Sequence, residues 1–321
     1  MTSYTIPQTD LTVSRIAYGC MHLGGRGRSD AEERAAAAAA IDAAVAGGIT
    51  LFDHADIYGR GRSEAVFGAV MQERPGLRDR VVLQTKAGIR FAGDPHPDAP
   101  KRYDFSYGHL VRSVEESLRR LRTDYVDVFL LHRPDPLAEP EEIARAFDAL
   151  HASGKVRHFG VSNHTAGQVE LLRAYVRQPL VVNQVELSLL HPHLIYEGVV
   201  ANRAGAPTAL ATGTLDYCRR AGLLVQAWSP VGGGALFAPP AMREAPLQTL
   251  VERVEAVAEA EGVTAGAILL AWLLRHPAGI QPVIGTTNPE RVRASCEAAA
   301  VSLSREAWYA LLEAACGAEV P

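Results

Sequence analysis

Short apolar runs alternate along the chain with longer stretches in which apolar positions recur at helical spacing. The runs predict strands because they are brief, rich in β-branched residues and bounded by polar or glycine-containing segments. The predicted strands cover residues 15–18, 49–52, 81–85, 126–131, 156–161, 180–185, 224–228 and 281–284. The predicted helices cover residues 29–46, 64–74, 106–121, 141–153, 166–177, 214–221, 247–261 and 265–276, and Asn288-Pro289-Glu290 begins another.

This alternation predicts an α/β protein whose parallel sheet is covered by helices. Eight strands fit a closed (β/α)8 TIM barrel, and the length suits one such domain over residues 1–321. An open, doubly wound sheet is the alternative, but it usually carries Gly-x-Gly-x-x-Gly after its first strand, and YGCMHLGGRGRS lacks that spacing. Residues 3–14 predict an N-terminal β-hairpin at the barrel bottom, and residues 305–315 predict an extra C-terminal helix.

Two connections after strands are unusually long: residues 88–105 and residues 186–213. A barrel places both at its C-terminal face, where active sites form. Long loops at that face usually carry function, so we expect both to shape a binding site, with a plain surface insertion as the alternative.

Composition limits the partners that we expect. The net charge of −4 and the pI of about 6.3 predict no surface for nucleic acid. No apolar run approaches the roughly 18 residues of a membrane span, and no apolar leader opens the sequence. The four cysteines are scattered and suit reduced structural residues. We therefore expect a cytoplasmic protein without nucleic-acid or membrane partners, and leave partner proteins open.

Polar side chains stand where three successive predicted strands end. Asp53 follows the second strand, Lys86 the third and His132 the fourth, and Tyr58 lies just beyond Asp53. Neighbouring parallel strands end side by side on one rim of a barrel, so these four side chains should cluster there. Each alone has a plainer explanation, such as an ion pair, a packing tyrosine or a buried histidine. All four on adjacent strand ends favour an active site.

The cluster predicts general acid–base chemistry at a carbonyl or an alcohol. A free phenol titrates at about pH 10, and a neighbouring ammonium should lower the pKa of Tyr58 toward neutrality. Asp53 would hold Lys86 charged, and His132 would bind the substrate oxygen. Proton transfer alone does not reduce a carbonyl, so the chemistry also needs a hydride donor.

These residues lie in segments that resemble the aldo-keto reductase superfamily. GGITLFDHADIYGRGRSE is similar to its Gly-x-x-x-x-Asp-x-x-x-x-Tyr-Gly signature, LQTKAG to its lysine strand and LLHRPD to its histidine strand. GKVRHFGVSN, NQVELSLLH, QAWSPVGGGALF and PVIGTTNPERV follow in the family's order. The chain looks most like bacterial oxidoreductases related to the potassium-channel β subunits.

The resemblance implies a reductase that transfers hydride from nicotinamide C4 of NADPH, or of NADH, to a small-molecule aldehyde or ketone. Tyr58 would be the general acid, Asp53 and Lys86 would tune it, and His132 would orient the carbonyl oxygen. The channel β subunits suggest an alternative, a cofactor-sensing binding or regulatory module with weak catalysis. The complete tetrad favours the enzyme.

The resemblance also implies the cofactor contacts. Ser162, Asn163 and Gln184 match residues that hold the nicotinamide carboxamide, and Trp228 matches an aromatic residue that stacks on the ring. The remaining matches lie around the pyrophosphate and adenosine: Ser229, Pro230, Gly232, Gly233, Leu236, Ile284, Gly285, Thr286, Thr287 and Arg291.

Arg291 matches the arginine that meets the adenosine 2′-phosphate, and it would lie in a helix first turn whose amides also favour an anion. Many relatives have Lys-Ser where this chain has Gly285 and Thr286. The expected preference for NADPH therefore depends on one guanidinium.

The substrate mouth is expected to include Met21, His22 and His54, of which His54 stands where the family usually has Thr or Ala. Four histidines expected near one rim also admit a metal-dependent hydrolase: His54, His132, His191 and His193. Because Tyr58 and Lys86 have no role in a typical zinc site, we predict no metal.

Overall fold

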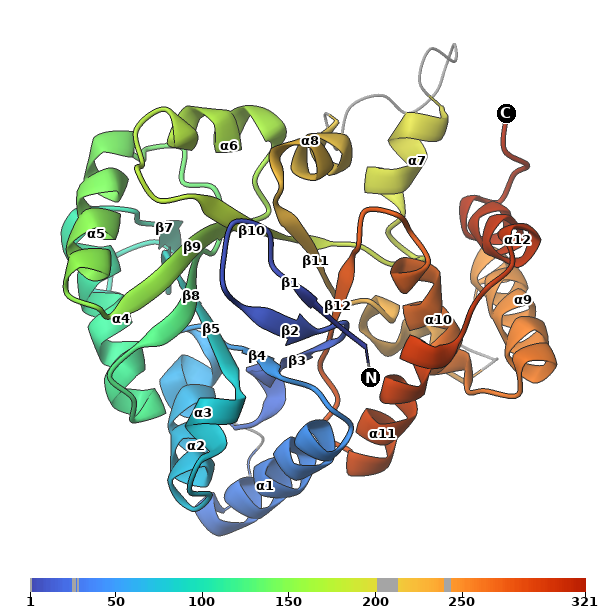
Figure 1. The fold of residues 1–321 in the computed structure, drawn as a ribbon, viewed down its shortest axis with the longest axis horizontal. Helices are drawn as coiled ribbons and strands as arrows, with labels where there is room; N and C mark the ends of the chain where they lie inside the picture. Colours follow the sequence, from blue (N-terminus) through green and yellow to red (C-terminus); the bar gives the residue numbers. More distant parts are fainter. Residues whose placement is uncertain (1, 25–26, 28, 201–212, 240–243) are drawn as a thin grey trace.

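Eight parallel strands close into a barrel in the computed structural model, which describes residues 2–24, 27, 29–200, 213–239 and 244–321 (Figure 1). In chain order the barrel strands are β3 (Ala17–Gly19), β4 (Leu51–Asp53), β5 (Val82–Ala87), β8 (Val126–Leu131), β9 (Val156–Ser162), β10 (Leu180–Glu186), β11 (Leu224–Trp228) and β12 (Gln281–Ile284). Each pairs in parallel with the next, and β12 pairs with β3 to complete the ring. The predicted (β/α)8 barrel is confirmed.

Helices surround the ring of strands (Figure 1). Phe52 of β4 packs on Phe67 of α2, with ring centroids 5.3 Å apart, and Phe147 of α5 stacks on Phe159 of β9 at 4.1 Å. The helices are α1 (Asp30–Ala46), α2 (Arg62–Gln72), α3 (Leu77–Arg80), α4 (Tyr107–Leu121), α5 (Pro140–Ala152), α6 (Ala166–Arg173), α7 (His193–Val199), α8 (Thr214–Ala221), α9 (Ala245–Glu261), α10 (Ala265–Leu274), α11 (Pro289–Glu297) and α12 (Arg305–Cys316).

The predicted N-terminal hairpin closes one end of the barrel. β1 (Ser3–Thr5) pairs antiparallel with β2 (Thr12–Ser14), and Figure 1 shows the two strands lying across the ring. Apolar residues of the hairpin, such as Ile6 and Val13, are fully buried in a cluster with Leu51 and Val128 from the first halves of two barrel strands. The hairpin thus seals the N-terminal end and leaves the C-terminal strand ends to form a site.

The extra C-terminal helix, α12, is also confirmed. Trp308 on α12 stacks on Trp272 of α10, with ring centroids 5.2 Å apart and planes within 10°. Each indole N–H donates to the backbone carbonyl oxygen of the other tryptophan, at 3.2 Å and 3.0 Å. This reciprocal pair fixes α12 on the outer face of the barrel.

Within the described residues, no single helix is long and apolar enough to cross a membrane. The bent pair Pro246–Glu261 and Ala265–Leu274 passes on length and composition only when its members are taken together.

Both long connections follow barrel strands. The first carries a small hairpin that the sequence did not predict, β6 (Ile89–Arg90) paired with β7 (Arg102–Tyr103). The second contains α7, and residues 201–212 of it lie outside the described residues.

Candidate active site

Asp53 and Lys86 form a buried ion pair at the C-terminal ends of β4 and β5. The strand register sets Asp53 opposite Gln84, and Lys86 shares the inward face of Gln84 because side chains alternate along a strand. Nζ of Lys86 donates to both carboxylate oxygens at 2.7 Å and to the backbone oxygen of His54 at 2.8 Å. The two side chains are 1% and 3% exposed, so a fixed pair of opposite charges lies at the barrel mouth.

Tyr58 lies beside this ion pair, and the chain turns with left-handed backbone directly after it. It begins the 3-10 turn Tyr58–Gly61, in which the three residues after the tyrosine have φ of 57°, 55° and 85°. Glycine, present at two of these three positions, adopts that conformation readily. The turn sets the Tyr58 ring with its centroid 5.2 Å from Nζ of Lys86 and 6.0 Å from the His132 ring, which it meets edge-on.

His132 completes the group from the end of β8. Its side chain is 8% exposed, and its Nδ1 has no hydrogen-bond partner among the residues that the structure describes. Burial and the positive charges of Lys86 and Arg133 hold the pKa of His132 well below its ordinary value. A neutral imidazole therefore lies beside the phenol at neutral pH.

The ammonium of Lys86 stays charged, as the sequence predicts, but the pKa of Tyr58 does not shift in the predicted direction. Burial would lower the pKa of Lys86, but the Asp53 carboxylate and the Tyr58 hydroxyl raise it above its ordinary value, so the ammonium is retained. Burial raises the pKa of Tyr58, and Lys86 opposes this increase without cancelling it. The predicted net lowering of the Tyr58 pKa is therefore wrong for this state of the protein, because desolvation outweighs the ammonium.

The four residues matched to the nicotinamide lie on β9, β10 and β11 or, for Asn163, directly after β9. Asn163, at a left-handed φ of 62°, donates through Nδ2 to Oγ of Ser162 at 2.8 Å. Its Oδ1 accepts a hydrogen bond from Nε1 of Trp228 at 3.0 Å. Ser162 in turn donates to the backbone oxygen of Gln184 at 2.8 Å. The side chains of Asn163 and Ser162, the backbone of Gln184 and the half-buried indole therefore hold one another in place.

The segment after Trp228 fits a phosphate-binding loop. Ser229 has a φ of 51°, and Gly232, Gly233 and Gly234 have φ of 63°, 63° and 91°. A Cβ at Gly232 would lie 2.5 Å from Cδ1 of Leu190, so the Leu190 side chain would have to move to admit one. Bare backbone of this kind can approach a phosphate closely. The buried residues matched in this segment are Pro230 and Leu236.

The residues matched to adenosine surround the start of α11. Arg291 is exposed in its first turn. The Asn288 side chain caps the helix, accepting from the backbone N–H groups of Glu290 at 2.8 Å and Arg291 at 3.1 Å. Those two amides are therefore engaged, contrary to the expectation that they bind an anion. The matched residues between β12 and this cap are the buried Ile284, the exposed Gly285 and the half-buried Thr286 and Thr287.

The expected place of His54 in the substrate mouth is wrong. Asp53 points inward, so the next side chain points outward, because side chains alternate on a strand. His54 is fully buried against Phe67, with ring centroids 4.6 Å apart. The other two expected mouth residues, Met21 and His22, are exposed.

Sequence reasoning missed three buried glutamines inside the barrel: Gln84, Gln226 and Gln281. Gln84 donates to Asp53 at 2.6 Å, and Gln226 accepts from Gln184 at 2.9 Å. The available signal was a polar residue inside an apolar strand, as in VVLQTK and LLVQAW.

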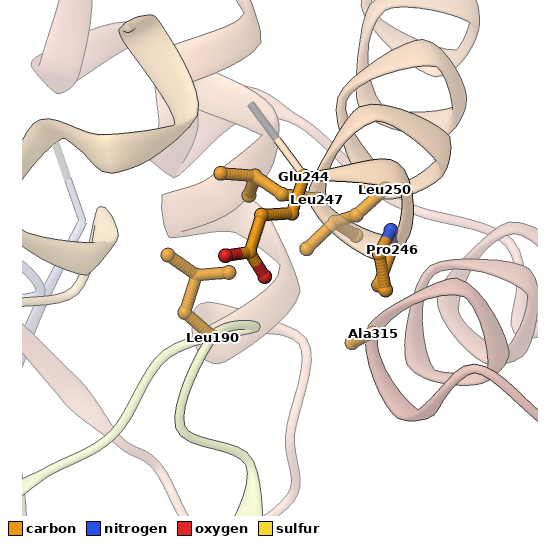
Figure 2. Close-up of a pocket in the computed structure, with 6 residues that line it drawn as sticks. All are labelled: Leu190, Glu244, Pro246, Leu247, Leu250 and Ala315. Atoms are coloured by element: carbon orange, nitrogen blue, oxygen red, sulfur yellow. The ribbon is translucent and has the colours of Figure 1, made fainter. Parts of the chain in front are cut away.

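A pocket of about 410 Å³ lies away from Asp53, Tyr58, Lys86 and His132, between α9, α12 and the loop after β10 (Figure 2). Its lining residues are Leu190, Glu244, Pro246, Leu247, Leu250 and Ala315. None belongs to the tetrad, so we do not assign the chemistry to it. The described residues contain no group of three or more His, Cys, Asp or Glu side chains that could hold a metal ion.

Comparison with known proteins decides the family. A model of the aldo/keto reductase family matches residues 15–315. The chain belongs to the aldo/keto reductase family. Aldo/keto reductases use nicotinamide cofactors, and the protein is an oxidoreductase.

Individual aldo/keto reductases resemble the chain over nearly its whole length. It is 41% identical over 312 residues to a 6-dehydroglucose reductase of Agrobacterium fabrum, which covers 97% of each chain. It is 37% identical to a 6-dehydroglucose reductase of Novosphingobium aromaticivorans, over 97% of this chain and 94% of the relative. The solved structure of a glycerol dehydrogenase from Gluconobacter oxydans superposes with a TM-score of 0.79 at 26% identity, over 97% and 94% of the two chains.

Proposed function

We propose that the protein reduces an aldehyde or ketone to an alcohol with NADPH, and that Tyr58 is the general acid. The observation that supports this best is the Tyr58 ring beside the buried Lys86–Asp53 pair, with the neutral His132 ring at its edge. NADPH, when bound, supplies the hydride from nicotinamide C4.

Each member of the tetrad has a distinct task. The Tyr58 hydroxyl donates its proton to the carbonyl oxygen as that oxygen gains negative charge. His132 hydrogen-bonds the same oxygen and fixes its position. The Lys86 charge stabilises the phenolate that Tyr58 becomes, and Asp53 keeps Lys86 charged and in place.

Residues outside the tetrad hold the cofactor in this proposal. Ser162, Asn163 and Gln184 bind the carboxamide, and Trp228 stacks on the nicotinamide ring. The loop from Ser229 receives the pyrophosphate. The exposed guanidinium of Arg291 binds the 2′-phosphate and favours NADPH over NADH.

For the substrate we propose a polyhydroxylated aldehyde of the kind that 6-dehydroglucose represents. Two relatives with that printed activity match the chain over nearly its full length. Polar groups also lie at the mouth, where the Arg133 guanidinium is 5.4 Å from the Trp228 ring centroid and His22 is exposed. NADPH oxidation, followed by absorbance, should be faster with 6-dehydroglucose than with an apolar aldehyde of similar size.

Tyr58→Phe tests the reaction, and Tyr175→Phe, which alters an exposed tyrosine, is its control. We expect Tyr58→Phe to lower kcat at least about 100-fold, because the general acid is lost. The dissociation constant for NADP+ should change less than about twofold, since the ring is retained. Wild-type turnover in Tyr58→Phe would contradict the proposal, and cofactor binding without turnover in the unmodified protein would favour a sensing module instead.

A further inference from the structure

Four glutamines form a hydrogen-bonded network inside the barrel: Gln84 on β5, Gln184 on β10, Gln226 on β11 and Gln281 on β12. Each is at most 2% exposed. In the ring of strands β5 lies opposite β11, so the bond between Gln84 and Gln226 crosses the barrel interior. The network therefore joins the neighbouring strands β10, β11 and β12 to β5, which shares no backbone hydrogen bond with β11.

Gln226 is the centre of this network. Its Oε1 accepts from Nε2 of Gln84 at 2.8 Å and from Nε2 of Gln184 at 2.9 Å. Its Nε2 donates to Oε1 of Gln84 at 3.2 Å and to Oε1 of Gln281 at 2.9 Å. These four bonds use both N–H groups and both lone pairs of the amide. If the Gln226 amide were reversed, its oxygen would face the oxygens of Gln84 and Gln281, and its nitrogen would face the nitrogens of Gln84 and Gln184.

Asp53 gives the network a direction. An ionised carboxylate only accepts hydrogen bonds, so the group that Gln84 turns toward Oδ1 of Asp53, at 2.6 Å, must be its NH2. The same NH2 meets Gln226, which must then present its carbonyl oxygen. That oxygen also receives the NH2 of Gln184. The Gln184 carbonyl oxygen consequently makes no hydrogen bond within the network.

We propose that Gln84 and Gln226 are positioning residues. The Asp53 carboxylate, which only accepts hydrogen bonds, orients the Gln84 amide, and through Gln84 and Gln226 it orients the Gln184 amide. Gln84 and Gln226 thereby fix which atom of the Gln184 amide faces the cofactor, so that its carbonyl oxygen accepts from the N–H group of the nicotinamide carboxamide. This inference rests on the proposed function, in which Gln184 binds that carboxamide. The acid–base group and the cofactor contact are thus oriented by one set of amides.

The chain itself offers a matched control. Gln281 is a fourth member of the network, but its bonds lead away, from Gln226 to the backbone oxygen of Ser14 at 2.7 Å. Gln281→Met and Gln226→Met both remove a buried amide and leave buried partners unsatisfied, so both should lower thermal stability. Only Gln226→Met interrupts the connection between Asp53 and Gln184.

The first experiment measures NADP+ binding by calorimetry in the folded, cofactor-free protein and both variants. We expect Gln226→Met to raise the dissociation constant about tenfold, which corresponds to one lost hydrogen bond of ordinary strength. Gln281→Met should stay within about twofold of the unmodified protein. Equal dissociation constants for the two variants would overturn the inference.

A second experiment tests the direction of the network, and it does not depend on Gln226→Met folding. In Gln84→Glu, a protonated carboxyl can still donate to Asp53 and accept from Gln226, whereas an ionised one only accepts and favours a reversed Gln226 amide. NADP+ binding, relative to the unmodified protein at each pH, should therefore weaken several-fold as the pH rises between roughly 6 and 9, because two adjacent carboxyls raise the pKa of one. In Gln84→Met the relative loss should be the same at every pH.

A loss in Gln84→Glu that is independent of pH would overturn the directional network while leaving the proposed function intact. Failure of the unmodified protein to bind either nicotinamide dinucleotide would overturn both. The two failures are therefore distinguishable in one set of titrations.

Discussion

Nζ of Lys86 lies 2.7 Å from each oxygen of the Asp53 carboxylate, and neither side chain is more than 3% exposed. The backbone oxygen of His54 accepts a third hydrogen bond from the same ammonium at 2.8 Å. Lys86 lowers the pKa of Tyr58 mainly through its charge and to a smaller extent through a side-chain hydrogen bond. The ion pair is both a structural element of the barrel mouth and the source of the electrostatic field at the phenol.

Breaking this pair should be costly from either side. Lys86→Met leaves a buried carboxylate and Asp53→Asn leaves a buried ammonium, so each should lower the free energy of unfolding by about 3–5 kcal/mol. The double variant should lose clearly less than the sum, because it removes both charges. Urea unfolding of the three variants measures this coupling, and additivity within about 0.5 kcal/mol would contradict it.

The pH dependence of turnover should follow the raised pKa of Tyr58. In the proposed mechanism carbonyl reduction needs the protonated phenol, which is present below its pKa and lost as the pH rises through it. We therefore expect kcat/KM for reduction to stay level between about pH 6 and 9 and to fall only in more alkaline solution. The reverse reaction, alcohol oxidation, needs the phenolate, so kcat/KM for oxidation should rise as the pH increases. A decline in reduction with a midpoint near neutrality would show that the pKa of Tyr58 is lowered instead.

The barrel and the gathering of its strand-end residues could be predicted from sequence because both follow from local patterns. Apolar runs and turn residues locate the strands, and the rule that parallel strands end together places Asp53 beside Lys86. Other features depend on quantities that the sequence does not display. The net shift of the Tyr58 pKa is set by desolvation, which requires the folded environment. The bond between Gln84 and Gln226 spans the barrel and has no signature in spacing.

His54 illustrates a third limit. Comparison with the family pattern led us to expect its side chain in the substrate mouth, but the alternation of side chains along β4 directs the ring outward, against Phe67 of α2. Both ring nitrogens are buried without a hydrogen-bond partner among the residues that the structure describes, and burial lowers the pKa of His54 from 6.5 to about 3. The folded protein thus holds this ring neutral where the unfolded chain would take up a proton. Its contribution to stability is present above pH 6.5 and is lost as the pH falls toward 3.

His54→Leu should therefore flatten the acid side of the stability curve. The thermal unfolding midpoint of the unmodified protein should fall more steeply between about pH 6.5 and 4 than that of the variant. His96→Leu, at an exposed histidine, provides the matched control and should leave the slope unchanged. Parallel curves for His54→Leu and the unmodified protein would mean that His54 does not stay neutral in the fold.

The choice between NADPH and NADH should depend on Arg291. The Asn288 cap already engages the backbone N–H groups of Glu290 and Arg291, so the guanidinium is the group in this turn left to bind a 2′-phosphate. Arg291→Met should raise KM for NADPH about tenfold, the loss expected for one charge-assisted contact, and leave KM for NADH within about twofold. Arg293→Met alters an exposed arginine on the same helix and controls for net charge. If both variants change KM for NADPH and KM for NADH by the same factor, the preference arises from overall charge or from another residue, and Arg291 does not bind the 2′-phosphate.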